Sequence, residues 1–440
     1  MCRFRASGRR AGLPPSPDGF GEPRRSSRAF LLFLFLLAAA CRHGSSLDDE
    51  AREYVRLAVA LGERDPDSLD FYAGPEGAVA DVRRKPPPLT AIKQDASVLA
   101  HRLDAESFAP TEAGRVRALS ADLTAMIARV DLLTGTRLSY DKESAVFFGV
   151  VPAPVDERGL AAIRSQIGEI VGPGGRLVDR YTAFAARFIV PADRLPDVMR
   201  AALDECRRRT LAHVALPSRE QVTLEFVRDK PWSAFSRYLG DARSRIQINT
   251  DFAFTVDQVL QIACHEGYPG HHVRNTLQAP GRNAGNRVPE RDVQLMFTPE
   301  ALESEGSGML AVDVAFPGHE RVRFVRDRLF PLAGLDVSGA DRHVQVERLT
   351  GDLQMAQIDL ARRYLDGGLE FARAVSALEE QALVPHAEAL VKYINEYRSY
   401  VTAYTAGRRL MESRLEACAG ADPTDDIRWR CFNSETPGSR

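Results

Sequence analysis

Three histidines and one glutamate stand within the eight residues from His265 to His272. Neutral imidazole nitrogens bind Zn²⁺ well, and a catalytic zinc usually has three protein ligands with one position open for water. A glutamate directly after the first histidine, here Glu266, is suited to take a proton from that water. The segment therefore predicts one zinc ion with a general base beside it.

The spacing of these histidines differs from the His-Glu-x-x-His pattern, in which two histidines four residues apart share one helix face. On a regular helix His271 is rotated by about 240° from His265, whereas His272 returns to within about 20°. Pro269 and Gly270 interrupt the helix, because the proline ring would clash with the carbonyl four residues earlier. A bulge there would move His271 into the second ligand position. We expect His271 as the ligand and keep His272 as the alternative ligand or as a group behind the ligands.

A third ligand is expected from the carboxylates downstream. Thr298 begins a predicted helix that runs on to Leu310. On that helix Glu303 and Glu305 are about 200° apart, so only one of them can face the metal. Small residues follow Glu305 at positions 306–308 and would let a second helix or a substrate approach closely. We therefore choose Glu305.

The elements that must position these residues are mainly helical. Most of the chain from residue 45 onward has helical periodicity, and β character is scarce. The best predicted strand is 245–249, which lies just before the histidines and which we expect to border the cleft and accept an extended peptide. A plain core strand is the alternative. The predicted helices cover 46–61, 111–135, 154–170, 194–214, 257–268, 345–366 and 370–411.

The N-terminus has the pattern of an export signal. Arginines within residues 24–28 precede an apolar run over 29–40, which is too short to span a bilayer. The run ends with alanines at 38–40 directly before Cys41, which resembles a bacterial lipobox, although Leu37 is one place further from the cysteine than usual. We expect cleavage before Cys41, a lipid on its thiol and a location in the cell envelope, with an ordinary signal peptide as the alternative.

Composition fits a large globular domain: 44% of the 440 residues are hydrophobic and 27% are charged. The formal net charge of −2 leaves no basic footprint, so nucleic acid is not expected as a partner. In an exported protein Cys418 and Cys431 could form a disulfide, while Cys264 is expected to pack as a small buried apolar residue. The predicted parts are a signal segment (1–41), a helical domain (45–411) and a C-terminal tail (412–440).

The segment His265-Glu266-x-x-Pro269-Gly270-His271-His272, followed by Glu305-Gly306, resembles the bacterial family "domain of unknown function 885", which is similar to gluzincin metallopeptidases. Weaker likenesses are Leu69-Asp70-Phe71-Tyr72, Ile246-x-Ile248-Asn249 and Tyr404-x-x-Gly407-Arg408. The resemblance implies a mostly α, gluzincin-like zinc peptidase fold with a small β element bordering the active-site cleft. It also implies His265, His271 and Glu305 as zinc ligands and Glu266 as the base. The family usually continues Glu-Gly-Trp-Ala, whereas this chain has Ser307-Gly308, which changes the shape of the substrate pocket.

Hydrolysis of an amide also needs a donor for the developing oxyanion. Tyr404, or Tyr400 one turn earlier, could supply it, as a similarly placed tyrosine does in gluzincin-like enzymes; a core role is the alternative. Asn249 and Arg408 are candidate substrate contacts, although Arg408 could equally be a solvated helix end.

The sequence thus predicts an exported, lipid-anchored, zinc-dependent peptidase. The alternatives are a lipoprotein that binds a metal or a peptide without catalysis, and a metal-dependent hydrolase of another amide or an ester.

Overall fold

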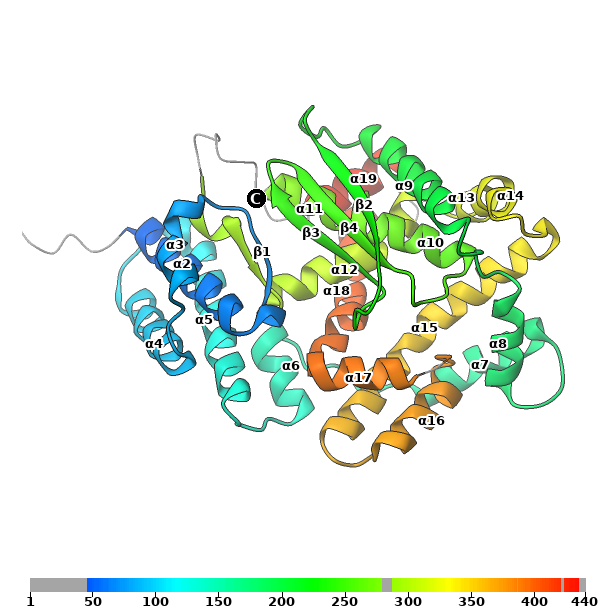
Figure 1. The fold of residues 1–440 in the computed structure, drawn as a ribbon, viewed down its shortest axis with the longest axis horizontal. Helices are drawn as coiled ribbons and strands as arrows, with labels where there is room; N and C mark the ends of the chain where they lie inside the picture. Colours follow the sequence, from blue (N-terminus) through cyan, green and yellow to red (C-terminus); the bar gives the residue numbers. More distant parts are fainter. Residues whose placement is uncertain (1–45, 279–286, 386, 421–422, 435–440) are drawn as a thin grey trace, which may run out of the picture. The chain divides into compact units, whose positions relative to one another are not determined.

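The structure, a computed structural model, describes residues 46–278, 287–385, 387–420 and 423–434. Helices form most of this part of the chain, and two small sheets complete it, so the predicted mostly helical fold is confirmed (Figure 1). No helix within these ranges is both long and apolar enough to cross a membrane. The predicted signal segment and its Cys41 lie outside the described residues.

The described residues form eighteen α-helices and five strands, which are numbered as in Figure 1. The helices are α2 (Leu47–Arg64), α3 (Ala80–Arg84), α4 (Leu89–Ala105), α5 (Ala113–Leu133), α6 (Tyr140–Phe148), α7 (Glu157–Val171), α8 (Leu177–Ala186), α9 (Leu195–Leu211), α10 (Val256–Ile262), α11 (His271–Gln278), α12 (Pro299–Ala315), α13 (Glu320–Phe324), α14 (Phe330–Ala333), α15 (Ala340–Leu365), α16 (Phe371–Gln381), α17 (Glu388–Tyr397), α18 (Val401–Ala419) and α19 (Asp425–Ser434). The strands are β1 (Leu69–Tyr72), β2 (Gln221–Val227), β3 (Ala234–Gly240), β4 (Arg243–Asn249) and β5 (Val293–Leu295).

The N-terminal helices α2, α4 and α5 form a layer with its own apolar core. Helix α2 begins where the sequence predicts, because the Ser46 side chain accepts a hydrogen bond from the Asp49 N–H and the Asp49 side chain reaches back to the cap. Leu57, Ile92 and Leu123 belong to the core between the three helices. Strand β1 lies between α2 and α4 in the chain and pairs with β5 in an antiparallel ribbon, which brings the N-terminal part of the chain against the segment that precedes α12.

The three-stranded sheet has β4 at its centre, parallel to β2 and antiparallel to β3. The predicted strand 245–249 is the main part of β4, with Ile246 and Ile248 buried on one face and Arg245 exposed on the other. Strands β3 and β4 both contact α11. The edge strand β3 also contacts the turn that carries the first histidine, so β3 and not β4 is the strand nearest the predicted site.

The predicted helix over 370–411 is divided into α16, α17 and α18. Pro385 lies between α16 and α17, and a proline ring has no N–H to offer a helix. Between α17 and α18 Arg398 adopts a φ of 53°. The buried carboxylate of Glu143 on α6 accepts hydrogen bonds from Arg398 Nε and from the Ser399 N–H, which fixes this second break and sets where α18 begins.

Helices α12 and α18 cross with their backbones almost in contact. A Cβ atom added at Gly306 would lie 2.2 Å from the Gly407 carbonyl oxygen, and one added at Gly407 would lie 2.4 Å from the Leu302 carbonyl oxygen. The small residues after Glu305 therefore admit a second helix, one of the two possibilities raised by the sequence. This crossing brings the face of α12 that carries Glu305 against the first turns of α18.

The segment after residue 411 continues the fold. Helix α18 runs through the predicted domain boundary to Ala419, and α19 returns against it with Trp429 and Phe432 in the main core. Cys418 and Cys431, for which the sequence predicts a disulfide, have their sulfur atoms 2.02 Å apart.

Replacing Gly306 with alanine should lower the free energy of unfolding by about 1 to 3 kcal/mol, because the helices must separate to admit the methyl group. The measurement is urea unfolding followed by circular dichroism. The control is Gly114→Ala in α5, where an added Cβ would meet no atom within 4 Å, so alanine should be neutral or stabilising by up to about 1 kcal/mol. Equal unfolding midpoints for the two variants would contradict a tight crossing.

Candidate metal centre

The histidine segment is a helix that widens, breaks and restarts. Helix α10 begins at Thr255, whose side chain accepts from the Gln258 N–H, and it passes into a π-helical turn over Ala263–Gly267. The chain then leaves helical geometry, and α11 restarts at His271. The interruption predicted at Pro269 and Gly270 is present, as a π turn followed by a short break.

Gly270 folds back onto the π turn. Its N–H donates to the Cys264 carbonyl over 3.0 Å. A Cβ at this position would lie 1.9 Å from the His265 carbonyl oxygen, so only glycine fits. This close approach brings the start of α11 beside the turn, and the rings of His265 and His271 come within 4.6 Å of each other, nearly perpendicular.

Glu305 on α12 completes a group of three. Its Oε2 atom lies 3.2 Å from His265 Nε2 and 3.7 Å from His271 Nε2. One potential ligand atom from each residue falls within 4.8 Å of the others, which is a spacing that can hold a metal ion. The two histidine side chains are each 14% exposed and the glutamate side chain 11%, so the group is nearly buried but still reached by solvent.

The donor atoms of this group fit a divalent cation. Among the described residues no N–H or O–H points at Glu305 Oε2 with hydrogen-bond geometry, although this oxygen is buried. The other oxygen, Oε1, accepts from the Tyr400 hydroxyl over 2.8 Å. The groups that face this oxygen are the two histidine rings, and a cation between the three side chains would balance its charge. Two histidines and one glutamate are also the ligand set of many catalytic zinc sites.

His272, the alternative ligand, is turned away from this group. Its side chain is fully buried, with Nδ1 hydrogen-bonded to Ser244 Oγ over 2.8 Å and Nε2 3.2 Å from a Glu220 carboxylate oxygen. Both ring nitrogens therefore have protein partners. Of the two adjacent histidines, the structure brings only His271 to His265 and Glu305.

Glu266 is buried beside the same group. Burial raises the pKa of its carboxyl, while the positive charge that His265 and His271 can carry opposes the rise. The backbone N–H of Ser236 on β3 faces this carboxylate and slightly lowers its pKa. The β element at the site is thus the edge strand β3, which the sequence did not predict, and the predicted strand β4 lies behind it.

The two tyrosines proposed as oxyanion donors have different surroundings. The Tyr400 hydroxyl donates to Glu305, so its proton is already used to hold that side chain. Burial and the Glu305 charge raise the pKa of Tyr400 far above its usual range. The Tyr404 hydroxyl is hydrogen-bonded to that of Tyr393 over 3.1 Å, and its ring is partly exposed. Tyr404 thus keeps a hydroxyl that is not bonded to Glu305.

The two predicted substrate contacts have other partners. The Asn249 amide donates to the carbonyls of Lys230 and Trp232 and is fully buried, so it shapes the loop between β2 and β3. Arg408 pairs with Asp313 and Glu412. The Asn249 amide nitrogen and the Arg408 Nε and Nη2 atoms thus have protein partners, and the two substrate contacts stay predictions.

Sequence reasoning missed a carboxylate near the metal ligands. Asp70 lies on β1, and burial raises its pKa to about 7, with His271 favouring the charged form and Glu305 and Glu266 disfavouring it. The sequence signal was slight: an acidic residue in a short apolar strand, within the stretch Leu69-Asp70-Phe71-Tyr72. Asp70 is far from His265, His271 and Glu305 in sequence, so its position near them could not be predicted.

Two further features lie directly against His265. A Cβ at Gly308 would come within 2.7 Å of the His265 ring, so a glycine at this position leaves room for that ring. Cys264 is bonded to Cys206 on α9 and is not the unpaired apolar residue expected from the sequence. Both cysteines are fully buried, and their bond ties α9 to the π turn.

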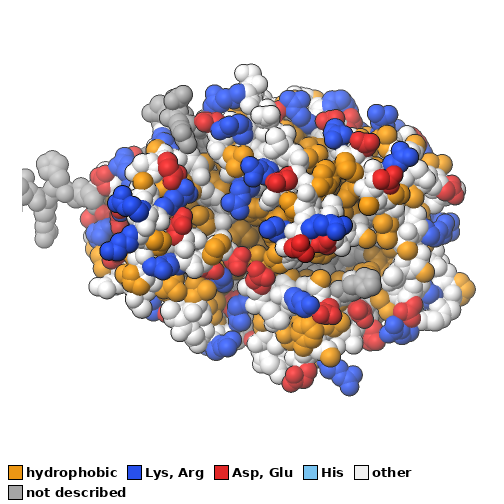
Figure 2. All heavy atoms as spheres, viewed as in Figure 1, with side chains coloured by type: hydrophobic (Ala, Val, Ile, Leu, Met, Phe, Trp, Pro, Cys, Tyr) orange, Lys and Arg blue, Asp and Glu red, His pale blue; other side chains and the backbone are white. Residues whose placement is uncertain are grey.

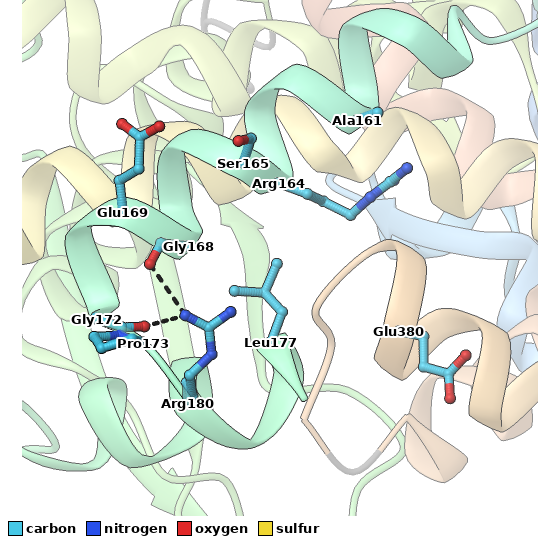
Figure 3. A pocket seen from close by; sticks show the side chains of 10 residues that line it. All are labelled: Ala161, Arg164, Ser165, Gly168, Glu169, Gly172, Pro173, Leu177, Arg180 and Glu380. Carbon is cyan, nitrogen blue, oxygen red and sulfur yellow. Dashed lines mark hydrogen bonds between the residues drawn. The ribbon is translucent and has the colours of Figure 1, made fainter. Parts of the chain in front are cut away.

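A surface pocket of about 730 Å³ lies elsewhere, between α7, α8 and α16 (Figure 3). Arg180 points into the end of α7 and donates to the carbonyls of Gly168 and Gly172, while Glu380 stands on the opposite wall. None of the residues that line this pocket belongs to the histidine site. On the face in Figure 2 the surface is hollowed between the sheet and the C-terminal helices, with side chains of both charges at the rim.

Comparisons with known proteins give only distant likenesses. No family model and no curated protein sequence matches this chain. One similar solved structure, from Colwellia psychrerythraea, carries a provisional lipoprotein assignment; its TM-score is 0.45 at 15% identity, over 81% of this chain and 69% of that one. A protein of unknown function from Shewanella oneidensis, with the same provisional assignment, has a TM-score of 0.41 at 12% identity over 81% and 75% of the two chains. An M32 carboxypeptidase from Deinococcus radiodurans has a TM-score of 0.40 at 14% identity over 88% and 89%. At these TM-scores the likenesses carry no argument about activity.

Replacing Gly308 with alanine should weaken zinc binding, because the added methyl group displaces the His265 ring. We expect a loss of affinity of at least about tenfold, in the range found when a group supporting a metal ligand is disturbed. The measurement is competition with a chromophoric chelator. Gly351→Ala on α15 is the control, since its Cβ would meet only the Arg408 side chain at an ordinary 3.8 Å. Unchanged affinity in Gly308→Ala would show that the ring has room to move.

The two disulfides provide a second comparison. Replacing Cys206 and Cys264 with serine should cost about 4 kcal/mol of stability and replacing Cys418 and Cys431 about 3 kcal/mol, from loop lengths set by separations of 58 and 13 residues. Only the replacement of Cys206 and Cys264 should also weaken zinc binding, because Cys264 directly precedes His265. Thermal unfolding with and without zinc measures both effects. A zinc-dependent shift in melting temperature that is the same in both double variants would contradict a role of the first disulfide at the metal centre.

Proposed function

We propose that this protein is a zinc-dependent peptidase. The observation that carries the proposal is the convergence of His265, His271 and Glu305. The Oε2 atom of Glu305 is buried between the two histidine rings and accepts no hydrogen bond of good geometry from the described residues. A bound zinc ion would polarise a substrate carbonyl and lower the pKa of a water molecule. One zinc ion is proposed, because the three residues supply one set of ligands and leave a coordination position open.

Glu266 is the proposed general base. Its carboxylate is buried next to His265 and His271, and the Ser236 N–H faces it. Burial raises its pKa, which strengthens it as a proton acceptor. In the proposed reaction Glu266 takes a proton from the attacking water and passes it to the leaving amine. Tyr404 is the proposed donor to the oxyanion, and the site is reached by solvent beside β3.

A peptide is the proposed substrate because a strand borders the site. Strand β3 is an edge strand that pairs with β4 alone in its sheet, and its Ser236 N–H faces the Glu266 carboxylate. An extended peptide could use neighbouring backbone groups of an edge strand in this way. The residue pattern from His265 to Gly306 supports placing the chain with the "domain of unknown function 885" proteins. The signal-like residues 1–41 support export and a lipid anchor at Cys41.

The test is Glu266→Gln in the full-length protein. The variant should bind zinc as the wild type does and should lose at least about 100-fold in kcat on a peptide library, since an amide cannot accept the proton. Peptide cleavage is followed by mass spectrometry, and bound metal by elemental analysis. Peptidase activity that survives unchanged in Glu266→Gln would exclude this mechanism, and a wild-type protein without stoichiometric metal would exclude the zinc site.

A further inference from the structure

We propose that Glu220 is a positioning residue that decides which of the two adjacent histidines becomes a metal ligand. Glu220 lies just before β2, outside the histidine segment, and it is not part of the proposed catalytic group. The inference rests on the proposed zinc site. It concerns a question that the sequence left open, the choice between His271 and His272.

One carboxylate oxygen of Glu220 contacts both sides of the break in the helix. Oε2 accepts a hydrogen bond from the Tyr268 hydroxyl over 2.6 Å and lies 3.2 Å from His272 Nε2. Tyr268 is the residue before Pro269, and His272 follows the first residue of α11. Glu220 Oε2 therefore contacts both Tyr268, where the chain leaves the π turn, and His272, the second residue of α11.

The partners of His272 then set the direction of His271. Successive side chains on a helix differ by about 100°, so fixing the His272 ring in the interior fixes the rotation of the first turn of α11. Ser244 Oγ on β4 holds the other nitrogen of the same ring, and the side chains of Ser244 and His272 are buried. With His272 held between Glu220 and Ser244, the adjacent His271 is directed to His265 and Glu305.

Glu220 is itself firmly placed. Its side chain is 3% exposed, and its second oxygen accepts from Arg207 Nε over 2.7 Å. Burial alone would raise the pKa of this carboxyl, but His272, Tyr268 and Arg207 together lower it to about 2, so it is ionised. Arg207 is the neighbour of Cys206 on α9, and Cys206 is bonded to Cys264. Two adjacent residues of α9 thus hold the segment before His265 and, through Glu220, the segment around His271.

The test compares Glu220→Ala with the wild-type full-length protein. Loss of the carboxylate should free Tyr268 and His272 and weaken zinc binding about 10- to 100-fold, the range typical of residues that orient metal ligands. Zinc affinity is measured by chelator competition. The visible absorption of the Co²⁺-loaded protein is the second readout, because its intensity reports ligand number and geometry, and it should change in Glu220→Ala. Glu220→Gln should restore most of the affinity, since its amide oxygen can still accept from Tyr268.

A matched control separates positioning from general loss of stability. Glu50 on α2 also has a side chain that is 3% exposed and an arginine partner, Arg102, at its surface side. Glu50→Ala should lower stability without changing zinc affinity or the Co²⁺ spectrum. If Glu220→Ala does not fold, Tyr268→Phe removes one of the two contacts and should weaken zinc binding in the same direction.

The outcomes distinguish this inference from the proposed function. A wild-type protein that binds zinc, together with unchanged zinc affinity and an unchanged Co²⁺ spectrum in Glu220→Ala, would overturn the positioning role and leave the zinc site standing. Equal weakening in Glu220→Ala and Glu50→Ala would also overturn it. A wild-type protein that binds no zinc would overturn both.

Discussion

The carboxylate of Glu305 is the group around which the centre of the molecule is arranged. One of its oxygens accepts from Tyr400, and the other is buried between two histidines with no hydrogen bond among the described residues. The two histidine rings face this buried charge, and a cation held between the three side chains would balance it. The position of Glu305 depends in turn on the crossing of α12 and α18, which Gly306 and Gly407 allow. The close packing of α12 against α18 therefore also fixes where the charge of Glu305 lies.

The supports of the site come from separate parts of the chain. The Ser236 N–H of β3 faces Glu266, α9 reaches the π turn through a disulfide, and Tyr400, just before α18, supplies the hydroxyl that holds Glu305. Each contact acts on a different residue, so Glu266, the turn that carries His265, and Glu305 each have a tertiary contact. Such preorganisation is the usual condition for a metal site that must keep its geometry during a reaction.

Much of this could be predicted from local patterns. The helix caps at Ser46 and Thr298 and the interruption at Pro269 follow from dihedral preferences and steric clashes between near neighbours. The choice of Glu305 over Glu303 rested on the small residues that follow it. The direction of His271 could not be derived in this way, because Glu220 and Ser244 lie far away in sequence. The break at Arg398 depends on Glu143 for the same reason. The substrate roles expected for Asn249 and Arg408 remain predictions, and the partners that the structure gives these side chains also lie elsewhere in the chain.

The three proposed ligands come from one stretch of the chain, since about forty residues separate His265 from Glu305. Two further residues of the site lie far from this stretch in sequence, Asp70 toward the N-terminus and Tyr400 toward the C-terminus. Such a layout separates two events during folding. The proposed metal ligands can meet through contacts of lower sequence separation, whereas the full charge environment forms only after long loops have closed. The proposed metal site and the charges around it are then completed at different stages of folding.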